Sequence, residues 1–223
     1  MNVKRITLFA GHYGSGKTNI AVNYAKFVKN SGKDCVLADI DIVNPYYRAK
    51  DSAGELETMG IHVISSTFAN SNVDVPALPG EVYSVIDNKE KCAIIDVGGD
   101  DRGALALGRY VPSIMAENNY DMLFVLNARR PLTCDIRGAL DAMNEISLAC
   151  RLPFTGIVNN TNIGIETTAD TVLSSLDFAN ELSAVTGLEI KMTTVVSSLV
   201  PDLEGKIENL FPLELQNFRK WER

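Results

Sequence analysis

Residues 11–18 read Gly11-His-Tyr-Gly-Ser-Gly-Lys-Thr18 and match the pattern GxxxxGK[ST]. The apolar, β-branched run Ile6–Ala10 precedes this pattern, and a segment with helical periodicity begins at Thr18 and stops at Gly32. The pattern binds phosphate when it connects a strand to a helix. The sequence therefore predicts a strand, a phosphate-binding loop and a helix in succession.

The residue types of this loop suit the polyphosphate of a nucleotide. Gly14 and Gly16 allow the backbone to curl so that consecutive N–H groups point at one phosphate, and the helix dipole adds positive potential there. Lys17 can reach the β and γ oxygens, and Thr18 can ligate Mg²⁺. We expect the whole loop and the residue after it to contact the nucleotide: Gly11, His12, Tyr13, Gly14, Ser15, Gly16, Lys17, Thr18 and Asn19.

The rest of the chain continues the alternation of strand and helix. Segments of helical period lie at residues 136–146 and 172–182, and the second stops before Gly187. Such alternation predicts an α/β fold with a doubly wound, mainly parallel sheet and helices on both faces. No linker or repeat divides the chain, so residues 1–223 are expected to form a single domain. The short apolar runs that resemble buried strands are Ile6–Ala10, Cys35–Ala38, Ile61–Ile64, Cys92–Ile95, Met122–Leu126, Thr155–Val158 and Ile190–Val196.

Composition excludes several functional classes. The chain has 223 residues, of which 46% are hydrophobic and 22% charged, as in ordinary globular proteins. A net charge of −7 argues against sequence-independent binding to nucleic acid. No apolar run is long enough for a transmembrane helix, and the N-terminus lacks the pattern of a signal peptide. We therefore expect a cytoplasmic protein whose four cysteines, which show no CxxC spacing, are reduced thiols.

Carboxylates follow two of the predicted strands. Asp39 and Asp41 come at the end of the second, and Asp96 comes at the end of the fourth, followed by Gly99. The carboxyl ends of parallel strands meet at one edge of the sheet, where the phosphate loop also lies. There Asp96 can hold Mg²⁺ through water and Gly99 can donate its N–H to the γ-phosphate. Either Asp39 or Asp41 is then expected to orient the attacking water, while the other supports the metal.

The segments GHYGSGKT, LADIDIVN and IIDVGGD, in this order and spacing, resemble the MinD/ParA/CobQ-type P-loop ATPases, over most of the chain. The resemblance implies a mainly parallel sheet, MgATP as ligand, and a homodimer with nucleotides at the subunit interface. It also implies that Asp39 and Asp41 hold metal and catalytic water, and that Asp96 to Gly99 form a second switch. Many such ATPases have a lysine directly after the first loop glycine, and this chain has His12 instead.

Asparagines close the sixth predicted strand, where related folds place an asparagine against the purine ring. Asn159 and Asn160 are both candidates, and alignment from Gly156 favours Asn160. The guanine-reading pattern NKxD ends in an aspartate, which is absent after either asparagine. The segment therefore favours adenine over guanine, although both asparagines can also simply shape a turn.

Two polar clusters flank the predicted site. Asn44, Tyr46 and Arg48 directly follow the paired aspartates, where a γ-phosphate-sensitive loop would move. Arg129 and Arg130 follow the fifth strand and can hold an anionic substrate, the nucleotide of a partner subunit, or neighbouring carboxylates.

The C-terminal segment has apolar residues at Phe211, Leu215, Phe218 and Trp221. This spacing predicts a helix over about residues 212–222 that caps its own domain. A membrane-binding helix is the alternative, but its basic content is modest.

Three functions fit these features. The first is a nucleotide switch that binds ATP and Mg²⁺, hydrolyses ATP slowly, releases ADP, and acts on a partner protein or in metallocofactor assembly. The second is an ATP-dependent, carboxylate-activating ligase of the CobQ/dethiobiotin-synthetase kind. The third is a passive nucleotide-binding module, which the His12 substitution makes plausible.

Overall fold

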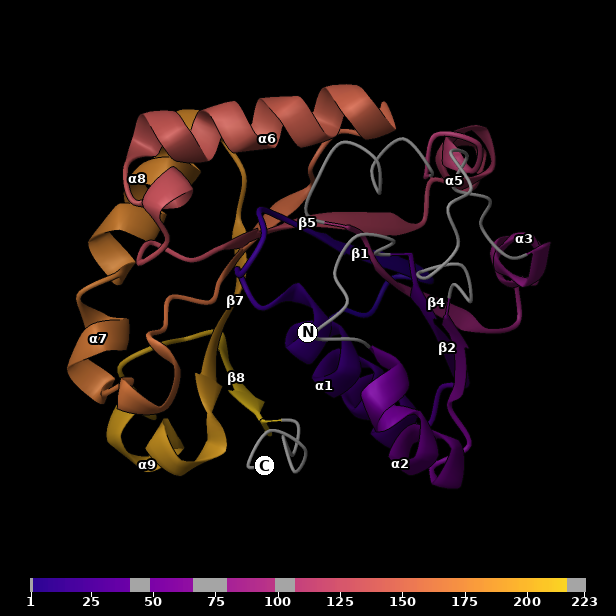
Figure 1. The fold of residues 1–223 in the computed structure, drawn as a ribbon, viewed down its shortest axis with the longest axis horizontal. Coiled ribbons are helices and arrows are strands. Elements are labelled where there is room, and N and C mark those ends of the chain that lie inside the picture. Colours follow the sequence, from indigo (N-terminus) through magenta and orange to yellow (C-terminus); the bar gives the residue numbers. More distant parts are fainter. Residues whose placement is uncertain (1, 41–48, 66–79, 99–106, 216–223) are drawn as a thin grey trace, which may run out of the picture.

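The computed structural model describes residues 2–40, 49–65, 80–98 and 107–215. Eight strands of this part form one sheet in the order β3-β2-β4-β1-β5-β6-β7-β8 (Figure 1). All the pairings between neighbouring strands are parallel, which confirms the predicted α/β fold. The strands are β1 (Ile6–Ala10), β2 (Cys35–Asp39), β3 (His62–Ser65), β4 (Cys92–Asp96), β5 (Tyr120–Leu126), β6 (Gly156–Asn159), β7 (Ile190–Val196) and β8 (Leu210–Leu213).

Helices cover both faces of this sheet (Figure 1). One face packs against α1 and α2, and its core contains Phe9 of β1 together with Ile20 and Leu56. The other face packs against α3, α5, α6 and α8, and its core contains Leu8, the residue next to Phe9. Successive side chains of a strand point to opposite faces, so β1 contributes to both cores. The helices are α1 (Lys17–Asn30), α2 (Ala53–Thr58), α3 (Gly80–Asp87), α5 (Val111–Glu117), α6 (Ile136–Cys150), α7 (Ala169–Leu173), α8 (Leu176–Thr186) and α9 (Val200–Leu203).

The C-terminal part of the described chain differs from the expected helix. Residues Leu210–Leu213 form β8, which pairs with β7, so no helix begins at residue 212. Phe211 and Leu213 are buried and Pro212 between them is exposed, which is the two-residue period of a strand rather than a helical one. Phe211 stacks edge-on against Phe27 of α1 with ring centroids 5.7 Å apart. The remainder of the predicted helix lies outside the described residues.

The expected helix at residues 172–182 is divided into two. The first, α7, ends at Leu173, and α8 starts at Leu176. Between them, Ser175 donates from its hydroxyl to the carbonyl of Val172 at 2.7 Å and accepts a hydrogen bond from Asn159 of β6 at 2.9 Å. This buried contact with the sheet holds the chain at the break.

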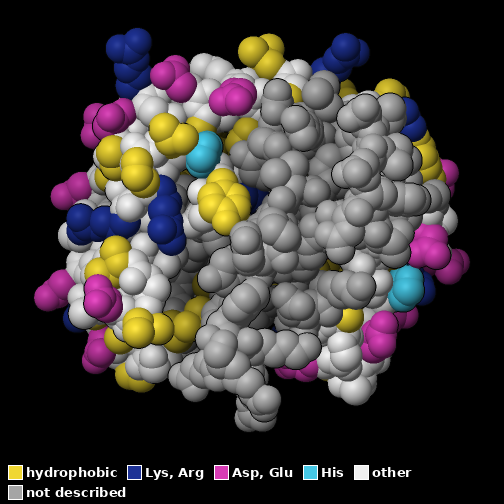
Figure 2. Space-filling model, in the orientation of Figure 1, with side chains coloured by type: hydrophobic (Ala, Val, Ile, Leu, Met, Phe, Trp, Pro, Cys, Tyr) yellow, Lys and Arg dark blue, Asp and Glu magenta, His cyan; other side chains and the backbone are white. Residues whose placement is uncertain are grey.

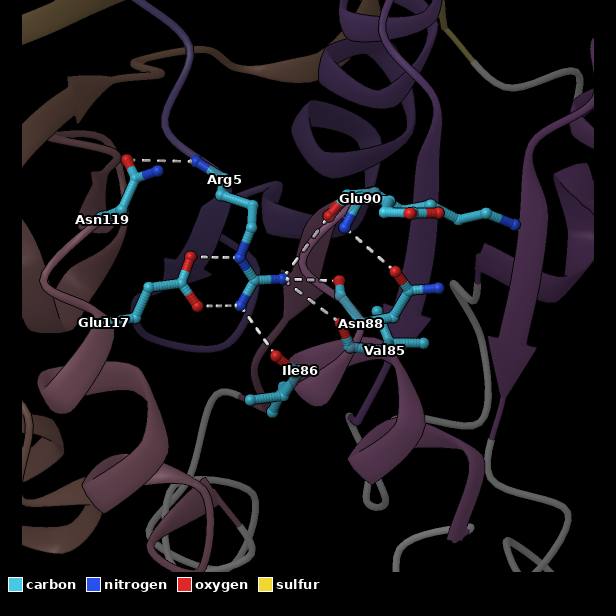
Figure 3. Close-up of polar contacts among 8 residues, drawn as sticks. Arg5, Val85, Ile86, Asn88, Glu90, Glu117 and Asn119 are labelled. Atoms are coloured by element: carbon cyan, nitrogen blue, oxygen red, sulfur yellow. Dashed lines mark hydrogen bonds and ion pairs between the residues drawn. The ribbon is translucent and has the colours of Figure 1, made fainter.

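A buried ion pair lies at the amino end of β1, at the opposite end of this strand from the phosphate loop (Figure 3). The guanidinium of Arg5, directly before β1, pairs with both carboxylate oxygens of Glu117 at the end of α5. The same guanidinium donates to the carbonyl oxygens of Ile86 at 2.8 Å and Asn88 at 3.2 Å, at the C-terminal end of α3. Arg5 thereby joins β1, α3 and α5.

Within the described residues, no helix is both long enough and apolar enough to span a bilayer.

Candidate nucleotide-binding site

The loop between β1 and α1 has a backbone that depends on glycine. Gly14 and Gly16 have φ angles of 77° and 91°, in the left-handed region. A Cβ at residue 16 would also collide with the side-chain amide of Asn160. The sequence pattern thus corresponds to a phosphate loop whose shape other residues could not adopt without strain.

Side chains from two other loops bind successive carbonyl groups of the phosphate loop. Nδ2 of Asn160, after β6, donates to the carbonyl oxygen of Ser15 at 2.6 Å. Nε of Arg130, after β5, donates to the carbonyl oxygen of Gly14 at 2.9 Å. These contacts hold the outer side of the loop.

Lys17 begins α1 and is only 5% exposed. Its ammonium donates to the carbonyl oxygen of His12 at 3.3 Å across the loop. The imidazole of His12 is half-buried, and its Nδ1 lies 3.3 Å from the carbonyl oxygen of Tyr13. The backbone of His12 therefore helps to position Lys17, whereas its ring does not line the cavity described below.

The carboxyl ends of β2 and β4 bring two aspartates together. Asp39 and Asp96 occupy opposite positions in the register of the two strands, and both side chains are buried. The hydroxyl of Thr18 donates to Oδ2 of Asp96 at 2.6 Å, and Oδ2 of Asp39 accepts a hydrogen bond from the backbone N–H of Ala49 at 3.2 Å.

These residues fit the chemistry of a magnesium site. Mg²⁺ prefers hard oxygen ligands and is usually held by one or two carboxylates, with substrate phosphates and water completing its coordination. The direct contact of Thr18 with Asp96 places a hydroxyl and a carboxylate oxygen beside each other next to the phosphate loop. Within the described part of the chain, no group of three or more His, Cys, Asp or Glu side chains forms a metal cluster of its own. A cation here would thus depend on the nucleotide for further ligands.

A cavity of about 450 Å³ opens beside the phosphate loop, within the range of small-molecule sites. The residues that line it include Lys17 and Thr18 of the phosphate loop and the apolar side chains of Ile165, Val196 and Leu215. Among the described residues that line it, none is aspartate or glutamate. The remaining lining residues are Tyr13, Gly14, Gly16, Asn19, Arg130, Asn160, Thr161, Asn162, Gly164, Thr167, Val172, Thr194, Val195 and Leu213.

The two asparagines at the carboxyl end of β6 have different surroundings. Asn159 is fully buried, donates to Ser175, and accepts a hydrogen bond from the hydroxyl of Thr161 at 2.8 Å. It does not line the cavity. Asn160 does line it, but its amide binds Ser15 on one side and accepts from the hydroxyl of Thr194 at 2.6 Å on the other. Both asparagines therefore stabilise the loops around the site.

The two arginines after β5 are also separated. Arg130 lines the cavity, whereas Arg129 donates from Nη2 to the hydroxyl of Ser174 at 3.2 Å and does not line it.

Sequence reasoning did not identify the residues that form the apolar walls. Val196 is the last residue of the seventh predicted strand, Leu215 belonged to the expected helix, and Ile165 lies in a short helical turn, Gly164–Glu166. Ile165 is 96% exposed even though it lines the cavity. In the sequence, the signal for Ile165 was an apolar side chain within an otherwise polar loop.

Several predicted site residues lie outside the described residues: Asp41, Asn44, Tyr46, Arg48 and Gly99.

On the face drawn in Figure 2, the half that carries α7 and α8 in Figure 1 shows hydrophobic side chains next to Lys or Arg side chains, with Asp and Glu side chains among them.

The fold is similar to that of several solved proteins. The cell division protein FtsY of Thermotoga maritima is 20% identical, with a TM-score of 0.58 over 85% of this chain and 61% of that chain. The signal recognition particle receptor FtsY of Elizabethkingia anophelis, in complex with GDP, is 15% identical, with a TM-score of 0.51 over 87% and 58%. The signal recognition particle 54 kDa protein of Aeropyrum pernix K1, also in complex with GDP, is 18% identical, with a TM-score of 0.52 over 84% and 40%.

This chain thus spans between 40% and 61% of the length of these three proteins. No protein-family profile matches the chain, and no curated protein matches it. The structural likeness and the phosphate loop together assign the chain the P-loop NTPase fold.

Proposed function

We propose that this chain is an Mg²⁺-dependent ATPase of the MinD/ParA/CobQ type that acts as a nucleotide switch. It would bind ATP, hydrolyse the γ-phosphate slowly and retain or release ADP according to the state of a partner. The partner would be another protein or a metallocofactor under assembly, and a homodimer across the nucleotide site would be one form of the switch.

The observation that carries this proposal is the polarity of the cavity. Lys17 and Thr18 of the phosphate loop line it, where a polyphosphate would bind, and apolar side chains such as Ile165, Val196 and Leu215 line it as well. The guanine base presents N–H donors that a carboxylate usually accepts, as in NKxD. The segment after Asn159 and Asn160 has no such aspartate, which supports adenine over guanine.

The phosphate end supplies the catalytic groups. Thr18, Asp96 and Asp39 would hold Mg²⁺, which when bound neutralises charge on the phosphate oxygens. Lys17 would contact the β and γ oxygens through its ammonium. Asp39 or Asp41 would orient the attacking water, and Gly99 would donate its N–H to the γ-phosphate.

The connection of Asp39 to Ala49 supports the switch. The carboxylate accepts from the backbone N–H of Ala49, so Ala49 lies next to Asp39, as does Ile40, which directly follows it in the chain. Asn44, Tyr46 and Arg48 of the intervening segment 41–48 would sense the γ-phosphate and contact the partner. A ligand shifts such a segment only through contacts that differ between the two states, and the γ-phosphate is the difference between ATP and ADP.

Calorimetric titration with ATP and GTP, each with Mg²⁺, tests the proposal. We expect ATP to bind much more tightly than GTP, and Lys17→Ala to remove most of the binding because a charge-assisted contact is lost. Equal affinity for both nucleotides, or tighter GTP binding, would contradict the adenine assignment. Phosphate release and oligomeric mass measured with ATP and with ADP test turnover and the switch.

A further inference from the structure

Arg130 occupies a position that its neighbours in the fold determine closely. Asn127, at the end of β5, is fully buried, and its carbonyl oxygen accepts from the N–H of Arg130 at 3.1 Å and from the hydroxyl of Thr133 at 2.7 Å. The carbonyl oxygen of Arg130 accepts from the N–H of Thr133 at 3.0 Å. The backbone of Arg130 is thus fixed on both sides.

The loop that carries Arg130 is also tied to the loop after β6. The side-chain amide of Asn127 donates to the carbonyl oxygen of Asn162 at 3.2 Å. The hydroxyl of Thr161 accepts from the N–H of Ala128 at 3.1 Å. Because both loops line the cavity, they hold Arg130 at a fixed place relative to its walls.

The guanidinium of Arg130 lies against the phosphate loop. Besides the hydrogen bond to the carbonyl oxygen of Gly14, a Cβ built on Gly14 would lie 3.5 Å from Nε and 3.7 Å from Cζ of Arg130. A guanidinium has five N–H donors, and this contact uses only the one on Nε. Among the described residues, no carboxylate forms a salt bridge with Arg130.

We propose that Arg130 is a nucleotide-positioning residue of its own chain, which braces the phosphate loop through Nε and donates from its terminal nitrogens to the phosphoryl oxygens of the bound nucleotide. The inference rests on the proposed nucleotide-binding function. Among the described residues that line the cavity, Arg130 is a cation besides Lys17, and His12 is not one of them. The phosphoryl groups of one subunit's nucleotide are then contacted without any side chain from a second subunit.

Three variants separate this role from a purely structural one. Arg130→Gln keeps an N–H donor for the carbonyl oxygen of Gly14 but removes the charge. Arg130→Lys keeps the charge but loses the planar fork. Arg129→Gln is the matched control, since Arg129 is also exposed and follows the same strand but binds Ser174 outside the cavity.

The measurement is the affinity for ATP, ADP, inorganic pyrophosphate and adenosine, determined by competition against a fluorescent nucleotide. We expect Arg130→Gln to weaken the affinity for ATP, ADP and pyrophosphate about 5- to 30-fold, which corresponds to the loss of a charge-assisted hydrogen bond. The affinity for adenosine should equal that of the unmodified protein. The phosphate affinity of Arg130→Gln should also depend less on salt, and Arg130→Lys should recover part of the loss.

Unchanged ATP and pyrophosphate affinities in Arg130→Gln would overturn the inference, as would an equal loss for adenosine, which would indicate a distorted site. Thermal melting of each variant without ligand shows whether the fold is retained. Failure of the unmodified protein to bind any nucleotide would instead contradict the proposed function itself, and the inference with it.

Discussion

The hydroxyl of Thr18 donates a 2.6 Å hydrogen bond to Oδ2 of Asp96, and this contact joins the first turn of α1 to the carboxyl end of β4. Asp96 is fully buried and stands opposite Asp39 in the strand register. Two carboxylates on neighbouring strands repel each other when both are charged, so a nearby cation stabilises them together. The same arrangement that holds α1 against the sheet therefore favours a divalent cation beside the phosphate loop.

The first prediction concerns magnesium. Thr18→Val removes a hydroxyl oxygen that can ligate the metal, and Asp96→Asn removes the negative charge of the carboxylate. Both changes leave the side-chain volume nearly the same. We expect the ATP affinity of the unmodified protein to fall when EDTA replaces Mg²⁺, and this difference to shrink at least several-fold in both variants. Calorimetry with and without Mg²⁺ measures it. Thr186→Val on α8 is the control, and full magnesium dependence in both site variants would refute the assignment.

The second prediction concerns Asn160. Replacing it by Ala removes the side-chain donor to the carbonyl of Ser15 and leaves the buried hydroxyl of Thr194 only its 3.4 Å contact with the carbonyl oxygen of Asn159. An unsatisfied buried polar group costs about 1–3 kcal/mol. We expect a lower free energy of unfolding and weaker binding of every nucleotide, because the phosphate loop loses a contact on its outer side. Urea denaturation and ATP titration measure the two effects. Asn209→Ala, at an exposed asparagine away from the site, should change neither; a stable Asn160→Ala variant with unaltered affinity would show that the contact is dispensable.

The third prediction concerns the reactivity of the four cysteine thiols. Burial raises the pKa of the Cys35 thiol to about 12, and burial also raises the pKa values of Cys92 and Cys150. A raised pKa keeps the group as the unreactive thiol, since the thiolate is the nucleophile. Cys134 is exposed. Mass spectrometry after iodoacetamide treatment at pH 8 should therefore find one modified cysteine, Cys134, in the native protein and four after denaturation. Rapid modification of Cys35 in the native protein would contradict this.

The phosphate loop and most strands could be predicted because their signals are local. The pattern of residues 11–18 specifies its own backbone through glycine, and each buried strand of a parallel sheet is a short apolar run. Asp39 and Asp96 could be paired because parallel strands end at one edge.

The features that could not be predicted depend on distant contacts. β8 is a four-residue strand that contains a proline, and its pairing with β7 and its packing on α1 decide its conformation. The break between α7 and α8 depends on a hydrogen bond from Asn159. Of two adjacent arginines, Arg130 faces the cavity because Asn127 fixes the turn, and no residue pattern distinguishes it from Arg129.

The last prediction concerns the ion pair of Arg5 and Glu117, which lies at the other end of β1 from the phosphate loop (Figure 3). Arg5→Met leaves Glu117 as a largely buried carboxylate without its partner and removes the donor to the carbonyl oxygen of Ile86, so we expect a loss of about 3–5 kcal/mol in the free energy of unfolding. The double variant Arg5→Met, Glu117→Leu should be more stable than Arg5→Met alone, because no charge is then buried unpaired.

Urea denaturation of both single variants and of the double variant completes the thermodynamic cycle. Five strand residues at about 3.3 Å each separate the pair from the phosphate loop, so the ATP affinity of the folded variants should stay within about twofold of the unmodified protein. A stability loss in Arg5→Met below about 1 kcal/mol would show that the pair does not hold α3 and α5 to the sheet. A large loss of ATP affinity in a folded variant would show instead that the amino end of β1 is coupled to the nucleotide site.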